Sequence, residues 1–171
     1  KLEDQIKVFL VGKGKLPFKS DTFDVVFSKD SIVHVPDKEK IFNEVSRVLM
    51  PGGAFVFSDW LISHDNNPSS EMKHYLELEN LGFGMASPLS YEKALKNCGF
   101  NSIEVRNRNS WYRKEARREL EILSGSDRKS YEKLTSEEFI KTQIMTWKAM
   151  ITVLDTGEHC PHHFKAIKPN N

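Results

Sequence analysis

Residues 23–35 read FDVVFSKDSIVHV, an apolar run that ends in a polar cluster. Residues 49–57, LMPGGAFVF, then place a Pro-Gly-Gly turn before a second apolar run. Between them, apolar residues spaced by three and four predict a helix that is capped by Asp37 and packs one face on a sheet. Open α/β folds bind their ligands at the carboxyl ends of such strands. Asp30 and His34 are therefore expected at the functional edge.

The rest of the chain alternates short apolar runs with helical patterns. This predicts a single α/β domain over residues 1–171, with a mostly parallel sheet and helices on both of its faces. The polar segment 124–135 is expected to be a connection. The expected strands are 6–11, 24–28, 54–59, 102–106 and 163–168, and the further expected helices are 71–81, 87–97, 111–123 and 136–154.

Composition excludes several classes of function. The 171 residues carry a formal net charge of +1, so no strong field favours nucleic acid or an anionic membrane. No run approaches the roughly 20 apolar residues of a membrane span. The basic cluster 113–118 also contains Glu115 and is expected to be a solvated helix face. Two distant cysteines make no disulfide framework, which favours a reducing, cytoplasmic setting.

Several blocks together resemble the second half of a class I S-adenosylmethionine-dependent methyltransferase. They are residues 16–18, 22–28, 47–53, 87–100 and 164–169. Within that family, the segment 29–34, KDSIVH, is similar to sarcosine/dimethylglycine and phosphoethanolamine methyltransferases. The resemblance implies methylation of a small molecule, with an amine as the acceptor and S-adenosylmethionine as the cofactor.

The same resemblance assigns roles to particular residues. Asp30 and His34 would be catalytic, with His34 accepting or relaying the amine proton and Asp30 fixing its tautomer or attracting the cationic substrate. The substrate would lie against aromatic rings, which attract a methylated ammonium, and these would be Trp60, Phe83 and Trp147, with Trp111 and Tyr112 as further candidates. The cofactor side would be formed by Gly12, Lys13, Leu16, Ser28 and Lys29.

The family's cofactor fingerprint is a Gly-rich turn after the first strand and an acidic residue after the second. This sequence shows neither, and residues 12–14 lack the family's carboxylate. The resemblance therefore implies an N-terminally incomplete, Rossmann-like sheet without its first two strands. In the family strand order, 3-2-1-4-5-7-6, strand 24–28 then becomes an open edge. We expect another copy of the chain, or segment 6–11, to cover it.

Alternatives to amine methylation remain at this stage. Phosphoethanolamine enzymes hold the phosphate with Arg and Tyr in the region aligned with Leu81 and Phe83, which favours a smaller amine here. A hydroxyl or carbon acceptor on the same fold is a second hypothesis, and a non-catalytic dimerising scaffold is a third. The crowded segment 158–163, EHCPHH, does not have the separated ligand pairs of a zinc site, so no metal is expected.

Overall fold

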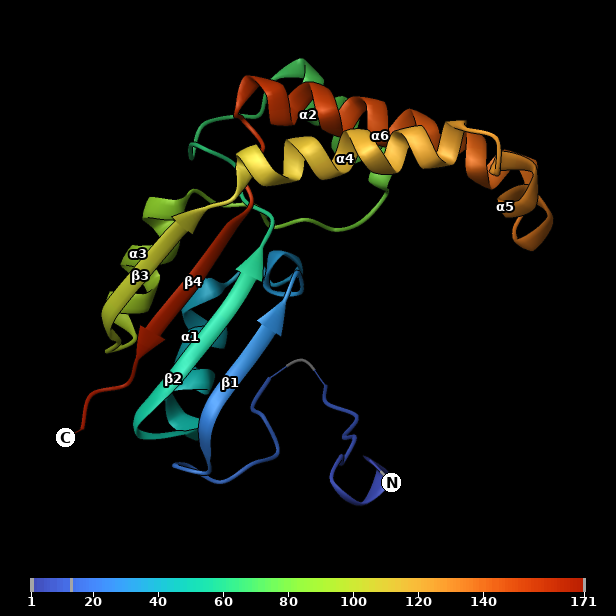
Figure 1. The fold of residues 1–171 in the computed structure, drawn as a ribbon. Helices are drawn as coiled ribbons and strands as arrows, with labels where there is room; N and C mark the ends of the chain where they lie inside the picture. The colour runs from blue at the N-terminus through green and yellow to red at the C-terminus, as the bar shows by residue number, and fades with distance from the viewer. Residues whose placement is uncertain (1, 13, 171) are drawn as a thin grey trace.

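The computed structural model describes residues 2–12 and 14–170 and contains one four-stranded sheet in the order β1-β2-β4-β3 (Figure 1). The strands are β1 (Phe23–Lys29), β2 (Leu49–Asp59), β3 (Asn101–Asn107) and β4 (His162–Ile167). β1 pairs with β2 in parallel, whereas β4 is antiparallel to both β2 and β3. The order matches the implied 4-5-7-6 part of the family's sheet, with β1 at the edge.

The expectation of a mostly parallel sheet is wrong for the described residues, because two of the three strand pairs are antiparallel. The long excursion between β3 and β4 stays beyond the carboxyl edge instead of crossing back to the other end of the sheet (Figure 1). The chain re-enters beside the end of β2, where the Cys160 N–H donates to the Leu61 carbonyl at 2.9 Å. From that point β4 can only run backwards along β2.

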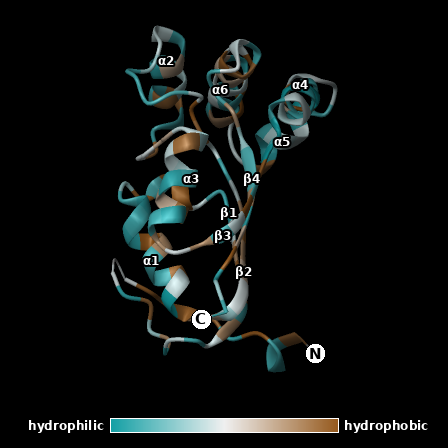
Figure 2. Cartoon of the chain, turned by 90° about the vertical axis from the view of Figure 1, so that its left-hand side faces the viewer, coloured by the Kyte–Doolittle hydropathy of each residue, from teal (hydrophilic) through white to brown (hydrophobic). Residues whose placement is uncertain are grey.

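The helices form two groups. α1 (Lys38–Val48) and α3 (Pro88–Asn97) lie on one face of the sheet, while α2 (Ser70–Glu79), α4 (Asn109–Ser124) and α6 (Glu137–Thr156) lie beyond its carboxyl edge (Figure 2). Side-chain oxygens of Asp37, Ser87 and Ser136 cap α1, α3 and α6. Each of these residues directly precedes a helix with an apolar stripe, which is where Asp and Ser are favoured as caps. Short 3₁₀ turns span Leu2–Asp4 and Ile32–His34. No described helix has the length and apolar character that a membrane crossing requires.

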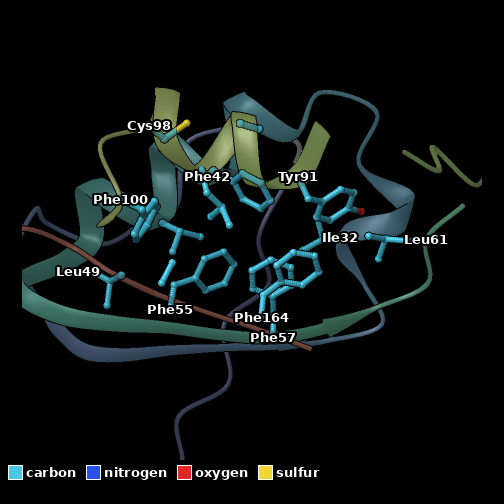
Figure 3. Packing of buried hydrophobic residues seen from close by; sticks show 14 of the residues in the cluster. Ile32, Phe42, Leu49, Phe55, Phe57, Leu61, Tyr91, Cys98, Phe100 and Phe164 are labelled. Carbon is cyan, nitrogen blue, oxygen red and sulfur yellow. The ribbon is translucent and has the colours of Figure 1, made fainter. Parts of the chain in front are cut away.

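Aromatic rings fill the space between the sheet and its two helices. Phe57 stacks on Phe164 of the neighbouring strand at 4.6 Å between ring centroids, and Phe42 and Tyr91 contact them from α1 and α3 (Figure 3). These rings are almost completely buried. Burying such a ring contributes roughly 1.5–3 kcal/mol, so this layer holds the strand ends that carry the polar residues.

Three further expectations are corrected. Segment 6–11 is exposed and pairs with no strand of the described chain, although the Phe9 ring meets that of Phe18 edge-on at 5.2 Å between centroids. The polar segment 124–135 contains a short helix, α5 (Arg128–Leu134), supported by an ion pair between Arg128 and Glu132 one turn apart. The second face of the sheet has no helix layer in the described residues, which leaves Val25 and Phe27 of β1 56% and 68% exposed.

Candidate active site

Asp30 lies directly after β1 in a left-handed backbone conformation, with φ of 53°. Asp tolerates this region better than most residues, and such conformations gather at functional sites. Its N–H donates to the Ser58 carbonyl at 2.9 Å, and the Ser58 hydroxyl donates to Oδ1 at 2.9 Å. Lys29 Nζ lies 2.6 Å from Oδ2, and this contact raises the pKa of Lys29. The carboxylate is thus tied to both parallel strands.

His34 closes the 3₁₀ turn that follows, and its ring is held by a different segment. Nδ1 lies 3.2 Å from the Gly82 carbonyl, and the ring stacks on Phe83 at 5.2 Å. A carbonyl only accepts, so Nδ1 carries the proton and Nε2 keeps its lone pair. The role of fixing the tautomer, predicted for Asp30, thus falls to Gly82, because Asp30 is bonded to Lys29 and Ser58.

One cavity of about 480 Å³ lies beside Asp30 and His34. It is walled by β1, the segment after β2, and helices α2, α4 and α6. Trp60, Phe83 and Trp147, the predicted substrate residues, all line it, together with Trp111 and Tyr112. The structure therefore brings both predicted catalytic residues and all predicted aromatic residues to one place. Further lining residues include Tyr75, Leu81, Ala116, Met150 and Leu154.

The cavity is acidic, which the sequence analysis missed. Glu79, Glu115 and Glu119 line it in addition to Asp30, whereas Lys29 is the only lysine or arginine among its lining residues. Glu115 and Glu119 follow Trp111 at intervals of four, so all three share one face of α4. This four-residue spacing is the feature of the sequence from which the acidic wall could have been predicted. The expected solvated face is instead formed by Arg113 and Arg117, which pair with Asp155 of α6.

A buried histidine supports the wall formed by Trp60. The His159 ring stacks on Trp60 at 5.0 Å and contacts the Tyr75 ring at 5.3 Å. His159 is completely buried, and burial lowers its pKa to about 4, so the ring is neutral at physiological pH. Trp60 also meets Tyr112 edge-on at 4.9 Å. The indole is thus fixed from two sides.

The predicted cofactor residues do not converge. Gly12 is exposed, and Lys13 lies outside the described residues. The Leu16 N–H is engaged by Glu44 at 2.7 Å, and the Ser28 hydroxyl by that of Ser31 at 2.9 Å.

Among the cofactor candidates that the structure describes, only Lys29 lines the acidic cavity, and its ammonium is paired with Asp30. The predicted cofactor residues that the structure describes therefore share no single cavity.

The crowded segment 158–163 has structural partners. Glu158 accepts hydrogen bonds from the Ser69 N–H at 2.8 Å and from the Ser69 hydroxyl, and it pairs with His64 at 3.2 Å. Because Glu158 anchors the start of α2 and His159 packs on Trp60, both are already engaged. Within the described part of the chain, no three His, Cys, Asp or Glu side chains gather as a metal site requires.

Comparison with known proteins agrees with this fold. Residues 2–57 match the model of a methyltransferase domain family. The structure superimposes on phosphoethanolamine N-methyltransferase 2 of Haemonchus contortus with a TM-score of 0.80 and 26% identity, over 89% of this chain and 35% of that one. The chain has the class I methyltransferase fold. The cofactor of that family is S-adenosylmethionine, and the Haemonchus enzyme was solved with S-adenosylhomocysteine.

Curated relatives of this methyltransferase-fold chain differ in the acceptor that their names state. It is 33% identical over 114 residues to the glycine/sarcosine/dimethylglycine N-methyltransferase of Actinopolyspora halophila, covering 66% of this chain and 20% of the relative. It is 36% identical over 107 residues to sterol 24-C-methyltransferase of Schizosaccharomyces pombe, covering 59% and 28%. The chain thus spans well under a third of either relative's length.

Proposed function

We propose that this chain supplies the acceptor site of an S-adenosylmethionine-dependent methyltransferase that methylates a small cationic amine. The observation that carries the proposal is the cavity beside His34, which combines aromatic rings with four carboxylates. Aromatic faces attract methylated ammonium groups, and carboxylates strengthen that attraction at short range. A phosphate-bearing acceptor is disfavoured, because the same four carboxylates would repel it.

Different residues orient the amine and remove its proton. The aromatic rings orient it, and Glu79 and Glu119 attract its positive charge, because the charge of Asp30 is already paired with Lys29. An ammonium has no free lone pair, so it must lose a proton before its nitrogen can act as a nucleophile. His34 Nε2 is available to take that proton, because Nδ1 is engaged with Gly82.

A matched pair of ligands tests the acceptor class. Choline and its neutral isostere 3,3-dimethylbutanol have the same shape but differ in charge. We expect choline to bind the chain roughly 2- to 30-fold more tightly, since a cation over aromatic rings contributes about 0.5–2 kcal/mol. Tryptophan fluorescence reports binding, because three tryptophans line the cavity. Phosphocholine should bind more weakly than choline.

The sterol relative makes a carbon acceptor the second candidate. Equal or tighter binding of 3,3-dimethylbutanol would overturn the amine proposal and favour an apolar acceptor. Calorimetry with S-adenosylhomocysteine is the companion measurement. Because the described cofactor candidates do not converge, we expect no micromolar binding by the 171-residue chain.

A further inference from the structure

Lys38 is a buried lysine whose hydrogen-bond acceptors are all backbone carbonyls of residues 32–35. Only 8% of the residue is exposed. Its Nζ donates to the carbonyls of Ile32 at 2.8 Å and Val35 at 2.6 Å, and lies 3.5 Å from that of Val33. Ile32 and Val33 belong to the 3₁₀ turn that carries His34, and Val35 directly follows it. A single ammonium thus spans the turn from its first residue to the residue after its end.

This arrangement is unfavourable for stability. Burial opposes the charged form and lowers the pKa of Lys38 to about 8. Lys38 is also the first residue of α1, where the helix dipole disfavours a cation. Most lysines at such a position reach solvent. The nearby Asp59 carboxylate and three backbone carbonyls offset these penalties, and the carbonyls place the ammonium against the turn.

The turn and the segment that binds His34 are joined to each other. The Val33 carbonyl accepts a hydrogen bond from the Gly84 N–H at 2.7 Å. Gly82, two residues earlier, accepts from His34 Nδ1, and Phe83 between them stacks on the same ring. Fixing the Val33 carbonyl therefore fixes both the backbone of His34 and the groups that orient its ring.

A buried network connects Lys38 to the other wall of the cavity. Its Nζ lies 5.4 Å from the centroid of the Tyr91 ring. The Tyr91 hydroxyl donates to Asp59 Oδ2 at 2.6 Å, and Asp59, which is 1% exposed, directly precedes Trp60. The lysine thus lies between the elements that carry His34 and Trp60.

We propose that Lys38 is a positioning residue that holds the turn Ile32–His34 against the segment 82–84 and so keeps His34 Nε2 directed at the acceptor cavity. The catalytic consequence rests on the proposed function, whereas the restraint on the turn does not. Lys38 itself does not line the cavity.

Nuclear magnetic resonance of the ¹⁵N-labelled 171-residue chain tests the restraint without any cofactor or acceptor. In the unmodified chain, a buried ammonium with three carbonyl neighbours should give a Lys38 NH₃⁺ signal that persists at pH 6. In Lys38→Met, amide exchange at Val35 and Gly84 should accelerate at least about tenfold, which corresponds to losing one charge-assisted hydrogen bond. The ¹⁵N signature of the single His34 tautomer should also be lost. Lys38→Arg, which keeps the donors, should restore part of the protection.

Lys40→Met is the matched control, because Lys40 is an exposed lysine in the same first turn of α1. It should leave both amides and the His34 ring unchanged. Unchanged exchange and an unchanged His34 signal in Lys38→Met, or an equal effect of Lys40→Met, would overturn the proposal. If Lys38→Met does not fold, absence of a persistent Lys38 signal in the unmodified chain overturns it. Lys38→Met could show these changes while the unmodified chain binds choline no more tightly than 3,3-dimethylbutanol. That result would reject the amine function and leave the restraint on the turn intact.

Discussion

At the scale of single residues, His159 makes stability depend on pH. Its pKa is about 4 in the folded chain because the ring is fully buried, against about 6.5 in the unfolded chain. At pH values between about 4 and 6.5, the His159 ring is protonated in the unfolded chain but not in the folded chain. Stability should therefore be complete above pH 6.5 and fall as pH drops towards 4, by on the order of 3 kcal/mol.

Urea unfolding at pH 7.0 and pH 4.5 measures this loss. His159→Gln removes the titrating group and should flatten that part of the profile, although the variant loses the stack on Trp60. His74→Gln, which changes an exposed histidine on α2, should keep the profile of the unmodified chain. A profile that stays equally steep in His159→Gln would assign the pH dependence to other groups.

At the scale of secondary structure, α4 presents one face to the acceptor cavity and another to solvent. Glu115 and Glu119 line the cavity, and Glu119 also accepts the Trp147 indole N–H at 2.9 Å. Glu115→Gln removes one negative charge beside the bound cation. We expect it to weaken choline binding by up to about 5-fold while leaving 3,3-dimethylbutanol unaffected, since a partly exposed charge pair contributes up to about 1 kcal/mol.

Glu121→Gln is the control on the same helix, because Glu121 is exposed and outside the cavity. Its affinity for both ligands should equal that of the unmodified chain. Equal weakening of choline binding by the two variants would show that the net charge of the chain, rather than the cavity, attracts the cation.

At the scale of the whole molecule, the sheet is open along β1. Segment 6–11 does not cover this edge, and the exposed Val25 and Phe27 extend the apolar surface over the uncovered face. Unpaired strand edges associate readily. We expect the 171-residue chain to self-associate through β1, and Phe27→Lys to shift it towards monomer, as measured by light scattering. A strictly monomeric unmodified chain would contradict this.

The sequence by itself determined most of the elements, apart from segment 6–11 and α5, and the edge where the polar residues gather. Helix stripes, capping residues and apolar runs are local signals, and they located β1, β2 and α1 because each segment must bury its own apolar face. The succession of strand, polar cluster, helix and strand along the sequence was enough to predict Asp30 and His34 at the carboxyl edge. The aromatic residues Trp60, Phe83 and Trp147 were predicted from the family resemblance.

Only the tertiary structure decided which groups complete the site. The partner of His34 is a backbone carbonyl 48 residues away, and the ring that lies over the buried ammonium of Lys38 is Tyr91 of α3, a different helix. The antiparallel direction of β4 follows from where the α4–α6 excursion ends in space. Local periodicity fixes what each segment buries, but contacts between distant segments depend on the packing of the whole chain, and those contacts set the charge and shape of the acceptor cavity.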